Sequence, residues 1–234
     1  MTGPLIEARA LGKSFGPTPV LREVNLRVEA GGGLAVIGAN GAGKSTLIRL
    51  LAGLSAPSFG DAMLFGEPAH SLAPALRRRV GLLSHQSFLY PNLSARENLE
   101  FYAALYGVAD ARKTASQWLE RVALDAAADA RVRGFSRGME QRLALARAML
   151  ARPDVLMLDE PFAALDRDGA ALAAALVSEA MSRGCAVLAS AHSTAPLEGL
   201  GFAVLALARS KLVRAEPDAA RQSAARAPLA PQVS

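Results

Sequence analysis

The chain has 234 residues, 51% of them hydrophobic, which is enough for one sizeable α/β domain with an inserted subdomain but not for a second full domain. Its 26 Lys and Arg residues outnumber its 21 Asp and Glu residues, and the formal charge of +5 suits either nucleic acid or an anionic membrane surface. No apolar run reaches the roughly 18 residues of a membrane-spanning helix, and the N-terminus has no long hydrophobic centre, so we expect a soluble chain that stays in the cytoplasm.

Two strands and a turn come first along the chain. Residues 5–11 and 20–28 alternate apolar and polar side chains, as half-buried strands do, and a turn rich in Gly and Pro at 16–19 separates them. We expect these strands to form an antiparallel pair. The apolar run at 34–37 then predicts another strand, and residues 46–54 predict a helix.

A phosphate-binding loop lies between this last strand and the helix. Residues 38–46 read GANGAGKST and fit the pattern G-x-x-x-x-G-K-[ST]. The glycines allow backbone N–H groups to turn inward, Lys44 adds a charge at the β- and γ-phosphates, and the Ser45 hydroxyl can bind Mg²⁺. The helix presents its positive end to the phosphates. We therefore expect a nucleoside triphosphate site that uses Gly38, Asn40, Gly41, Gly43, Lys44, Ser45 and Thr46.

The middle of the chain is predicted to hold short strands and then a helical block. We expect strands around residues 63–65 and 79–84, the second leading to Gln86. From residue 94 to residue 150 apolar side chains recur at helical spacing, which predicts helices inserted between strands, with their aromatic side chains in the core. Pro153 is expected to end the last of these helices.

Two carboxylates follow the next apolar run. Residues 155–158 are all apolar and lead directly into Asp159 and Glu160, which places both acids at the carboxyl end of a buried strand. Open parallel sheets bind their ligands at this edge. Asp159 suits Mg²⁺ coordination through water, and Glu160 can reach a water molecule in line with the γ-phosphate.

The last part of the chain contains the single cysteine and a change of composition. Cys185 lies in an apolar run and is expected to be buried, and one cysteine excludes a disulfide framework or a Cys-rich zinc site. Residues 216–234 lack large apolar side chains and are expected to be a disordered basic tail. Three elements precede this tail: an Ala-rich helix at 165–183, a strand at 187–191, and a hairpin formed by 202–207 with 212–213.

The order of these motifs resembles that of the ATP-binding-cassette (ABC) family over nearly all of residues 5–213. In that family the phosphate-binding loop is followed by a loop with a glutamine, a signature segment, a strand ending in Asp-Glu, and a histidine after the next strand. These places are taken here by Gln86, residues 135–139, Asp159 with Glu160, and His192. The resemblance implies ATP and Mg²⁺ as cofactors, hydrolysis by Glu160, His192 and Gln86, and a metal held near Ser45, Gln86 and Asp159.

Three further side chains are interpreted through the resemblance. Phe15 occupies the place of the family's aromatic residue that stacks on adenine, and packing in the core is the alternative reading. His70 and His85 match no position of the family pattern, so we expect no functional role for them.

The signature segment, FSRGM, departs from the family's LSGGQ at Phe135, Arg137 and Met139. Ser136 and Gly138 match the pattern and are expected to open a helix whose end attracts an anion. In the family this anion is the γ-phosphate of ATP bound by the other subunit, so the resemblance implies a head-to-tail homodimer with shared ATP sites. Arg137 either assists the phosphate site or points to solvent.

The resemblance also implies an architecture. We expect one ABC ATPase domain over residues 1–215, with a P-loop NTPase core built on a mainly parallel sheet. An antiparallel β subdomain is expected at its N-terminus, and an α-helical subdomain is expected to be inserted at about 92–137.

The function implied is that of an ATP-hydrolysing subunit that powers export through separate integral membrane subunits, at the cytoplasmic face of the inner (plasma) membrane. Residues 84–99, with Phe88, Leu89 and Tyr90 as exposed anchors, look like the partner-binding segment of the haem-exporter-type complex of cytochrome c maturation. An ATPase of a drug, lipid or polysaccharide exporter is the alternative. A soluble family member acting on DNA or ribosomes is less favoured, because zinc cysteines, long coiled coils and a second cassette are absent, and no nucleic-acid partner is expected.

Overall fold

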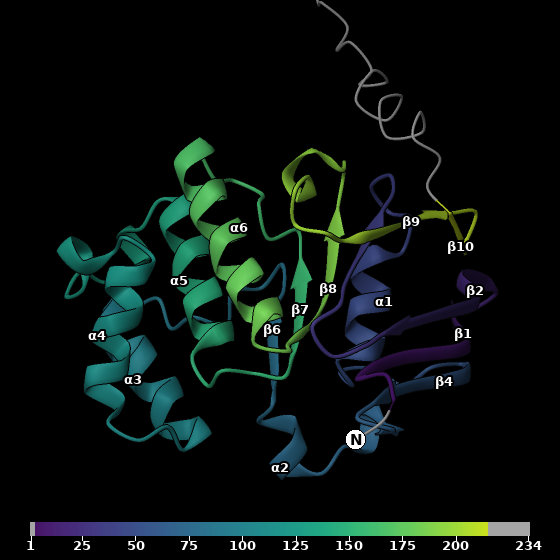
Figure 1. The fold of residues 1–234 in the computed structure, drawn as a ribbon, viewed down its shortest axis with the longest axis horizontal. Helices are drawn as coiled ribbons and strands as arrows, with labels where there is room; N and C mark the ends of the chain where they lie inside the picture. Colours follow the sequence, from purple (N-terminus) through teal and green to yellow (C-terminus); the bar gives the residue numbers. More distant parts are fainter. Residues whose placement is uncertain (1–2, 215–234) are drawn as a thin grey trace, which may run out of the picture.

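Two β-sheets and a block of helices make up the part of the chain that the computed structural model describes, residues 3–214 (Figure 1). In the view of Figure 1 an antiparallel sheet lies at the right, a mainly parallel sheet at the centre, and helices at the left. The described residues therefore have the mixed α/β architecture that the sequence predicts. The predicted tail, residues 216–234, lies outside the described residues.

The antiparallel sheet has the strand order β2-β1-β4-β5. Its first two strands pair as predicted, but both run further than their alternating pattern indicates, leaving only residues 16–17 as the turn. The alternation ends early because the register shifts between Ala8 and Ser14, where the strand bulges. A Cβ atom at Gly12, inside this bulge, would meet the Phe59 ring at 1.9 Å. The strands are β1 (Ile6–Phe15), β2 (Thr18–Val28), β4 (Phe59–Leu64) and β5 (Glu67–Pro68).

The second sheet has the order β10-β9-β3-β8-β7-β6 and is parallel except for β10, which pairs antiparallel with β9. The hairpin predicted near the end of the described chain is thus present as β9 and β10. The strands are β3 (Gly33–Ile37), β6 (Val80–Leu83), β7 (Val155–Asp159), β8 (Ala186–Ala191), β9 (Ala203–Ala208) and β10 (Lys211–Arg214).

The helix after the phosphate-binding loop begins earlier than predicted. Helix α1 spans Lys44–Leu51 rather than residues 46–54. Gly43, with φ of 107°, ends the loop and caps the helix, so the last residues of the motif already have helical backbone. The helix cannot continue through Gly53, where φ is 70° and a Cβ atom would meet the Ala69 carbonyl oxygen at 2.1 Å.

The helices between residues 95 and 149 form the predicted block, and together with the Ala-rich helix predicted at 165–183 they cover the edge and one face of the parallel sheet, whereas a short helix at 74–77 lies outside the block (Figure 1). These helices are α2 (Pro74–Arg77), α3 (Ala95–Tyr106), α4 (Ala111–Arg121), α5 (Arg137–Met149) and α6 (Arg167–Ser182). Short 3₁₀ helices occur at η1 (Ala69–Ser71), η2 (Asp125–Ala127), η3 (Val132–Gly134) and η4 (Ala195–Leu197). None of the helices within residues 3–214 has both the length and the apolar character needed to cross a bilayer.

The parallel sheet separates two apolar cores. In β7, Val155 and Met157 pack with α1 and the antiparallel sheet, whereas Leu156 and Leu158 pack with α5, α6 and the helical block. Because both faces are buried, the central strands read as continuous apolar runs rather than alternating ones. Cys185, just before β8, is buried as predicted, and its burial raises the pKa of the thiol to about 12.

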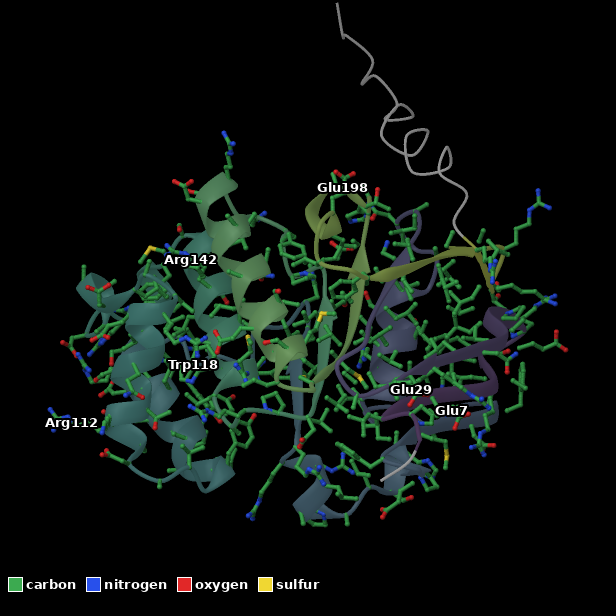
Figure 2. The ribbon with its side chains drawn as sticks, viewed as in Figure 1. Glu7, Glu29, Arg112, Trp118, Arg142 and Glu198 are labelled. Carbon is green, nitrogen blue, oxygen red and sulfur yellow. The ribbon has the colours of Figure 1, made fainter. Side chains whose placement is uncertain are left out.

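The aromatic side chains of the helical block divide between core and surface. Tyr102 and Trp118 are buried as predicted. Figure 2 shows Trp118 within the block and Arg112 at its outer edge. The prediction of a core position is wrong for Phe101, which is 42% exposed, and the neighbouring Leu105 is exposed as well. An exposed apolar cluster of this kind points to an interaction surface.

The N-terminus of α3 provides a test of stability. Ser94 Oγ accepts a hydrogen bond from Glu97 N at 3.1 Å, and Glu97 Oε2 accepts one from Ser94 N at 2.7 Å. We expect Ser94→Ala to lower the free energy of unfolding by about 1 kcal/mol, measured by urea denaturation, because the cap is lost. Ser178→Ala, at an exposed position within α6, is the matched control and should change it by less than about 0.5 kcal/mol. Equal losses in both variants would contradict a specific capping effect.

Candidate functional site

The phosphate-binding loop lies at the carboxyl end of β3, and its glycines are required by close packing. A Cβ atom at Gly43 would meet Val20 Cγ1 at 2.9 Å, and one at Gly38 would meet the Leu207 carbonyl oxygen at 2.8 Å. Gly41 and Gly43 also have positive φ angles, of 76° and 107°. These conformations turn backbone N–H groups toward the mouth of the loop, as an anion site requires.

Lys44 is buried where this loop meets α1. Its side chain is only 5% exposed, and Nζ donates hydrogen bonds to the carbonyl oxygens of Gly38 at 2.7 Å and Ala39 at 3.2 Å. Burial lowers the pKa of Lys44, and the nearby carboxylates of Glu160 and Asp159 oppose that effect. The ammonium group is thus held at the loop by hydrogen bonds to two backbone carbonyl groups and by the charges of two carboxylates.

Asp159 and Glu160 occupy the carboxyl end of β7, as predicted, and Ser190 of β8 holds both. Ser190 Oγ donates a hydrogen bond to Asp159 Oδ1 at 2.6 Å and accepts one from Glu160 N at 3.0 Å. Sequence reasoning missed Ser190. Its signal was a single hydroxyl inside the apolar strand at 187–191, where an unpaired polar side chain would be costly.

Glu160 is the centre of a cluster of charged and polar groups. Its carboxylate Oε1 lies 2.9 Å from His192 Nε2 and 3.9 Å from Lys44 Nζ. The Glu160 backbone is left-handed, with φ of 54°, and Gln141 Nε2 donates to its carbonyl oxygen at 3.2 Å. The structure therefore brings together the acid and the histidine that the sequence placed after two different strands.

A cavity of about 620 Å³ connects these groups, within the 300 to 1,000 Å³ common for small-molecule sites. It contains most of the predicted loop residues together with Asp159, Glu160 and His192. His85, for which no role was expected, also faces it. The lining residues are Val20, Asn40, Gly41, Ala42, Gly43, Lys44, Ser45, Thr46, His85, Asp159, Glu160 and His192.

Gln86 lies beside this cavity rather than in its lining. Together with Ser45 and Asp159 it lines an adjoining hollow of about 200 Å³, so the predicted metal-binding side chains share one hollow. Hydroxyl, amide and carboxylate oxygens are the donors that Mg²⁺ prefers, and Mg²⁺ usually needs only one or two carboxylates. Among residues 3–214 no group of three or more His, Cys, Asp or Glu side chains could hold a metal. The oxygen donors therefore fit Mg²⁺ better than a transition metal.

Phe15 does not line the main cavity. Its ring is 59% exposed at the end of β1, with Lys13 Nζ 5.4 Å from the ring centroid. This exposure contradicts the alternative of core packing. An exposed aromatic face remains available for stacking, and the adenine contact stays a prediction.

Ser136 and Gly138 lie apart from the phosphate-binding loop of the same chain. Ser136 caps α5, and its Oγ accepts a hydrogen bond from Met139 N at 3.3 Å. Gly138 packs against Ala164, whose carbonyl oxygen would be 3.1 Å from a Cβ atom. Neither residue faces the 620 Å³ cavity, whereas the exposed Arg137 lines a second hollow of about 570 Å³. The two halves of the expected site are thus separate within one chain.

An exposed aromatic patch, defined here as Phe88, Tyr90 and Phe101, lies beyond Gln86. Phe88 is 42% and Tyr90 46% exposed, while Leu89 is only half-buried against the core. The Tyr90 and Phe101 rings meet edge to face with centroids 5.1 Å apart. Asn98 fixes the backbone of Tyr90 through hydrogen bonds of 2.8 and 3.1 Å.

Arg147 of α5 packs against the buried side of the patch. The side chain is buried, and its guanidinium carbon lies 5.5 Å from the centroid of the Phe88 ring and 5.4 Å from that of Tyr102. Tyr102 donates a hydrogen bond to the Phe88 carbonyl oxygen, and Arg147 donates one to the Leu82 carbonyl oxygen at 2.6 Å. The patch is therefore attached to α5 rather than carried on a free loop.

Sequence comparisons place these features in a known family. The sequence pattern of the family described as "ABC transporter" matches residues 21–163. Nod factor export ATP-binding protein I of Cupriavidus pinatubonensis is 36% identical over 80% of this chain, which spans 58% of that protein. A spermidine/putrescine import ATP-binding protein, PotA of Legionella pneumophila, is 39% identical over 71% of this chain, which spans 46% of it. Cytochrome c biogenesis ATP-binding export protein CcmA 2 of Cupriavidus metallidurans is 36% identical over 89% of this chain and 97% of its own length.

Solved structures agree with this fold. An ATP-binding subunit of an ABC transporter superimposes with a TM-score of 0.83 and 28% identity, over 94% of this chain and 93% of the other. A dimeric bacterial ABC transporter cassette superimposes with a TM-score of 0.82 and 25% identity, over 89% of this chain and 97% of the other. A dimeric structure of a post-hydrolysis state of an ATP-binding cassette, bound to ADP and Pi, superimposes with a TM-score of 0.80 and 25% identity, over 89% of this chain and 97% of the other.

The arrangement around Glu160 generates a test of hydrolysis. Glu160→Gln keeps the size and hydrogen-bonding capacity of the side chain but removes its basicity, so ATP should still bind while the rate of phosphate release falls by about 10² to 10⁴. Lys44→Ala should instead weaken ATP binding by about tenfold or more, because a hydrogen bond to a charged group is lost.

Glu198→Gln, the same change at an exposed position, is the control and should hydrolyse ATP normally. Phosphate release and ATP binding are measured on each purified variant. Normal turnover by Glu160→Gln would remove this carboxylate from the reaction.

Proposed function

The chain belongs to the ABC transporter family, and we propose that it is the ATP-hydrolysing subunit of an exporter whose membrane-spanning subunits are separate chains. The observation that carries this proposal is the cluster of Lys44, Glu160 and His192 in one cavity with the phosphate-binding loop. The cavity combines an anion cradle with a carboxylate that can accept a proton.

We infer the following division of labour in the reaction. The loop amides and Lys44 bind the β- and γ-phosphates, and α1 directs its positive end toward them. Mg²⁺, held by Ser45, Asp159 and Gln86, would neutralise charge on the phosphate oxygens. Glu160 accepts a proton from the attacking water, and His192, 2.9 Å away, orients the carboxylate.

The proposed active form is a head-to-tail homodimer. Ser136 and Gly138 open α5 at a surface separate from the chain's own cavity, so an anion there would come from elsewhere. One related cassette was solved as a dimer in two structures, which supports this assembly. Each ATP would then lie between the loop of one chain and Ser136 of the other, with Phe15 against adenine. Arg137 is exposed beside that helix end and could face either the phosphate or solvent.

The aromatic patch is the proposed contact with the membrane subunits, which would place the chain at the cytoplasmic face of the inner (plasma) membrane. Phe101 of the patch belongs to the helical subdomain, proposed at about 92–137 within a domain of residues 1–215, and Phe88 and Tyr90 lie in the segment that leads into it. Exposed aromatic side chains are enriched at the centres of protein interfaces and often carry most of the binding energy.

Replacing part of the patch tests this contact. Tyr90→Ala with Phe101→Ala removes two packed rings, and we expect membrane association to weaken by about tenfold or more while ATP binding is unchanged. Val213→Ala, at an exposed apolar position on β10, is the control. The measurement is the membrane-bound fraction in the native host after fractionation. Unchanged association of the double variant would exclude the patch as the docking surface.

Within exporters we propose the haem-exporter type of cytochrome c biogenesis. The support is the match to a protein of that name along 97% of its length, together with the sequence of residues 84–99. Similar identity to a Nod factor exporter and to a polyamine importer keeps a general transport ATPase as the alternative.

Deleting the gene separates these two possibilities. The haem-exporter type predicts loss of covalently haem-loaded c-type cytochromes, seen by haem staining, while b-type cytochromes remain at normal levels. Restoring the gene should restore the c-type cytochromes, and the Glu160→Gln form should fail to do so. Normal levels of c-type cytochromes in a deletion strain with no second copy of the gene would exclude the haem-exporter type and leave the general transport ATPase as the proposed function.

A further inference from the structure

His85 lies where three hollows of the molecule meet. It lines the 620 Å³ cavity with Lys44 and Glu160, the 570 Å³ hollow with Arg137, and the 200 Å³ hollow with Gln86. Within residues 3–214 no other residue lines all three. The side chain is exposed and makes no hydrogen bond or ion pair to the described residues. Its ring nitrogens are therefore available to a ligand.

The strand register brings the loop that carries His85 to the carboxyl edge of the sheet, beside the cavity. β6 and β7 are neighbouring parallel strands, and Leu83 pairs with Leu158. β6 ends at Leu83 and β7 ends at Asp159, so His85 lies in the loop after β6 and Glu160 directly after β7, and both line the 620 Å³ cavity. On the other side of β7, His192 reaches Glu160 from β8. Glu160 therefore shares the cavity with two histidines: His192 contacts its carboxylate, and His85 lies in the cavity wall.

The turn that carries His85 is braced at both ends. Ser84 Oγ donates a hydrogen bond across His85 to the Gln86 carbonyl oxygen at 2.7 Å. Ser87 Oγ donates one to Glu140 Oε1 at 2.7 Å, which ties the turn to the first turn of α5. Because both flanks are fixed, the backbone of the turn keeps His85 at the cavity wall, and its exposed imidazole is free to orient toward a ligand.

We propose that His85 contacts the terminal phosphate of the bound nucleotide as a hydrogen-bond donor and thereby favours the triphosphate over the diphosphate. The inference rests on the proposed ATP binding. A neutral imidazole already carries one N–H donor, so the contact needs no change of charge. The terminal phosphate belongs at the end of the cavity where Lys44, Glu160 and His192 converge. A diphosphate does not extend to that end and would lose the contact.

The test compares the affinities of ATP and ADP for the purified full chain, by calorimetry. His85→Ala should weaken ATP binding by about tenfold or more, the loss expected for a hydrogen bond to a charged group, and leave ADP binding unchanged. The same loss should appear with Mg²⁺ and in EDTA, because the contact is made to phosphate and not through the metal near Gln86. His85→Asn, which keeps an N–H donor, should recover part of the ATP affinity.

Two further variants make the result decisive. His70→Ala, at another exposed histidine, should change neither affinity. His85→Leu also lacks a donor and must reproduce the loss, with thermal unfolding confirming that each variant is folded. Equal losses for ATP and ADP, no loss for ATP, or a loss seen only with Mg²⁺ would each overturn the contact while leaving the proposed function intact. Failure of the unaltered chain to bind ATP would overturn both.

Discussion

The in-register pairing of the parallel strands β3, β8 and β7 is the constraint on which the site depends. It aligns Ile37 with Ala191, and Asp159 with Ser190, so that the strands end at one edge of the sheet. Both faces of the sheet are buried, and a slip of one residue would exchange the side chains of the two cores. By fixing the strand register, the apolar cores therefore also fix the positions of the polar groups at the carboxyl ends of these strands.

Some of the strained backbone of the described residues lies where this edge carries its chemistry. Glu160 and Ala164, and Phe88 in the neighbouring loop, all have left-handed backbone although none is glycine. Such a conformation costs about 1 to 3 kcal/mol and persists only when the surroundings hold it. Ser190 and Gln141 hold Glu160 through its amide and carbonyl groups, and Tyr102 holds the Phe88 carbonyl. The helical block thus contributes to the geometry of both the carboxylate and the aromatic patch.

Sequence reasoning found what is encoded locally and missed what depends on a neighbouring strand. The phosphate-binding loop and the Asp159–Glu160 pair were recognisable because each is a short pattern whose chemistry follows from its own spacing. Ser190 escaped because its position beside Glu160 follows from the pairing of β7 with β8, and strand register cannot be derived from the sequence alone. The bulge between β1 and β2 likewise made both strands longer than predicted, because it interrupts the alternation of apolar and polar side chains from which strands are recognised.

The burial of Cys185 has a practical consequence for chemistry on this protein. It is the single cysteine of the sequence, and the thiolate is the nucleophilic form of the side chain. With a pKa near 12 and only 3% exposure, the native thiol stays protonated and shielded at neutral pH. A cysteine introduced on the surface would then be the single reactive thiol of the folded chain. Spectroscopic labels or cross-linkers can therefore be attached at chosen positions without first altering the native residue.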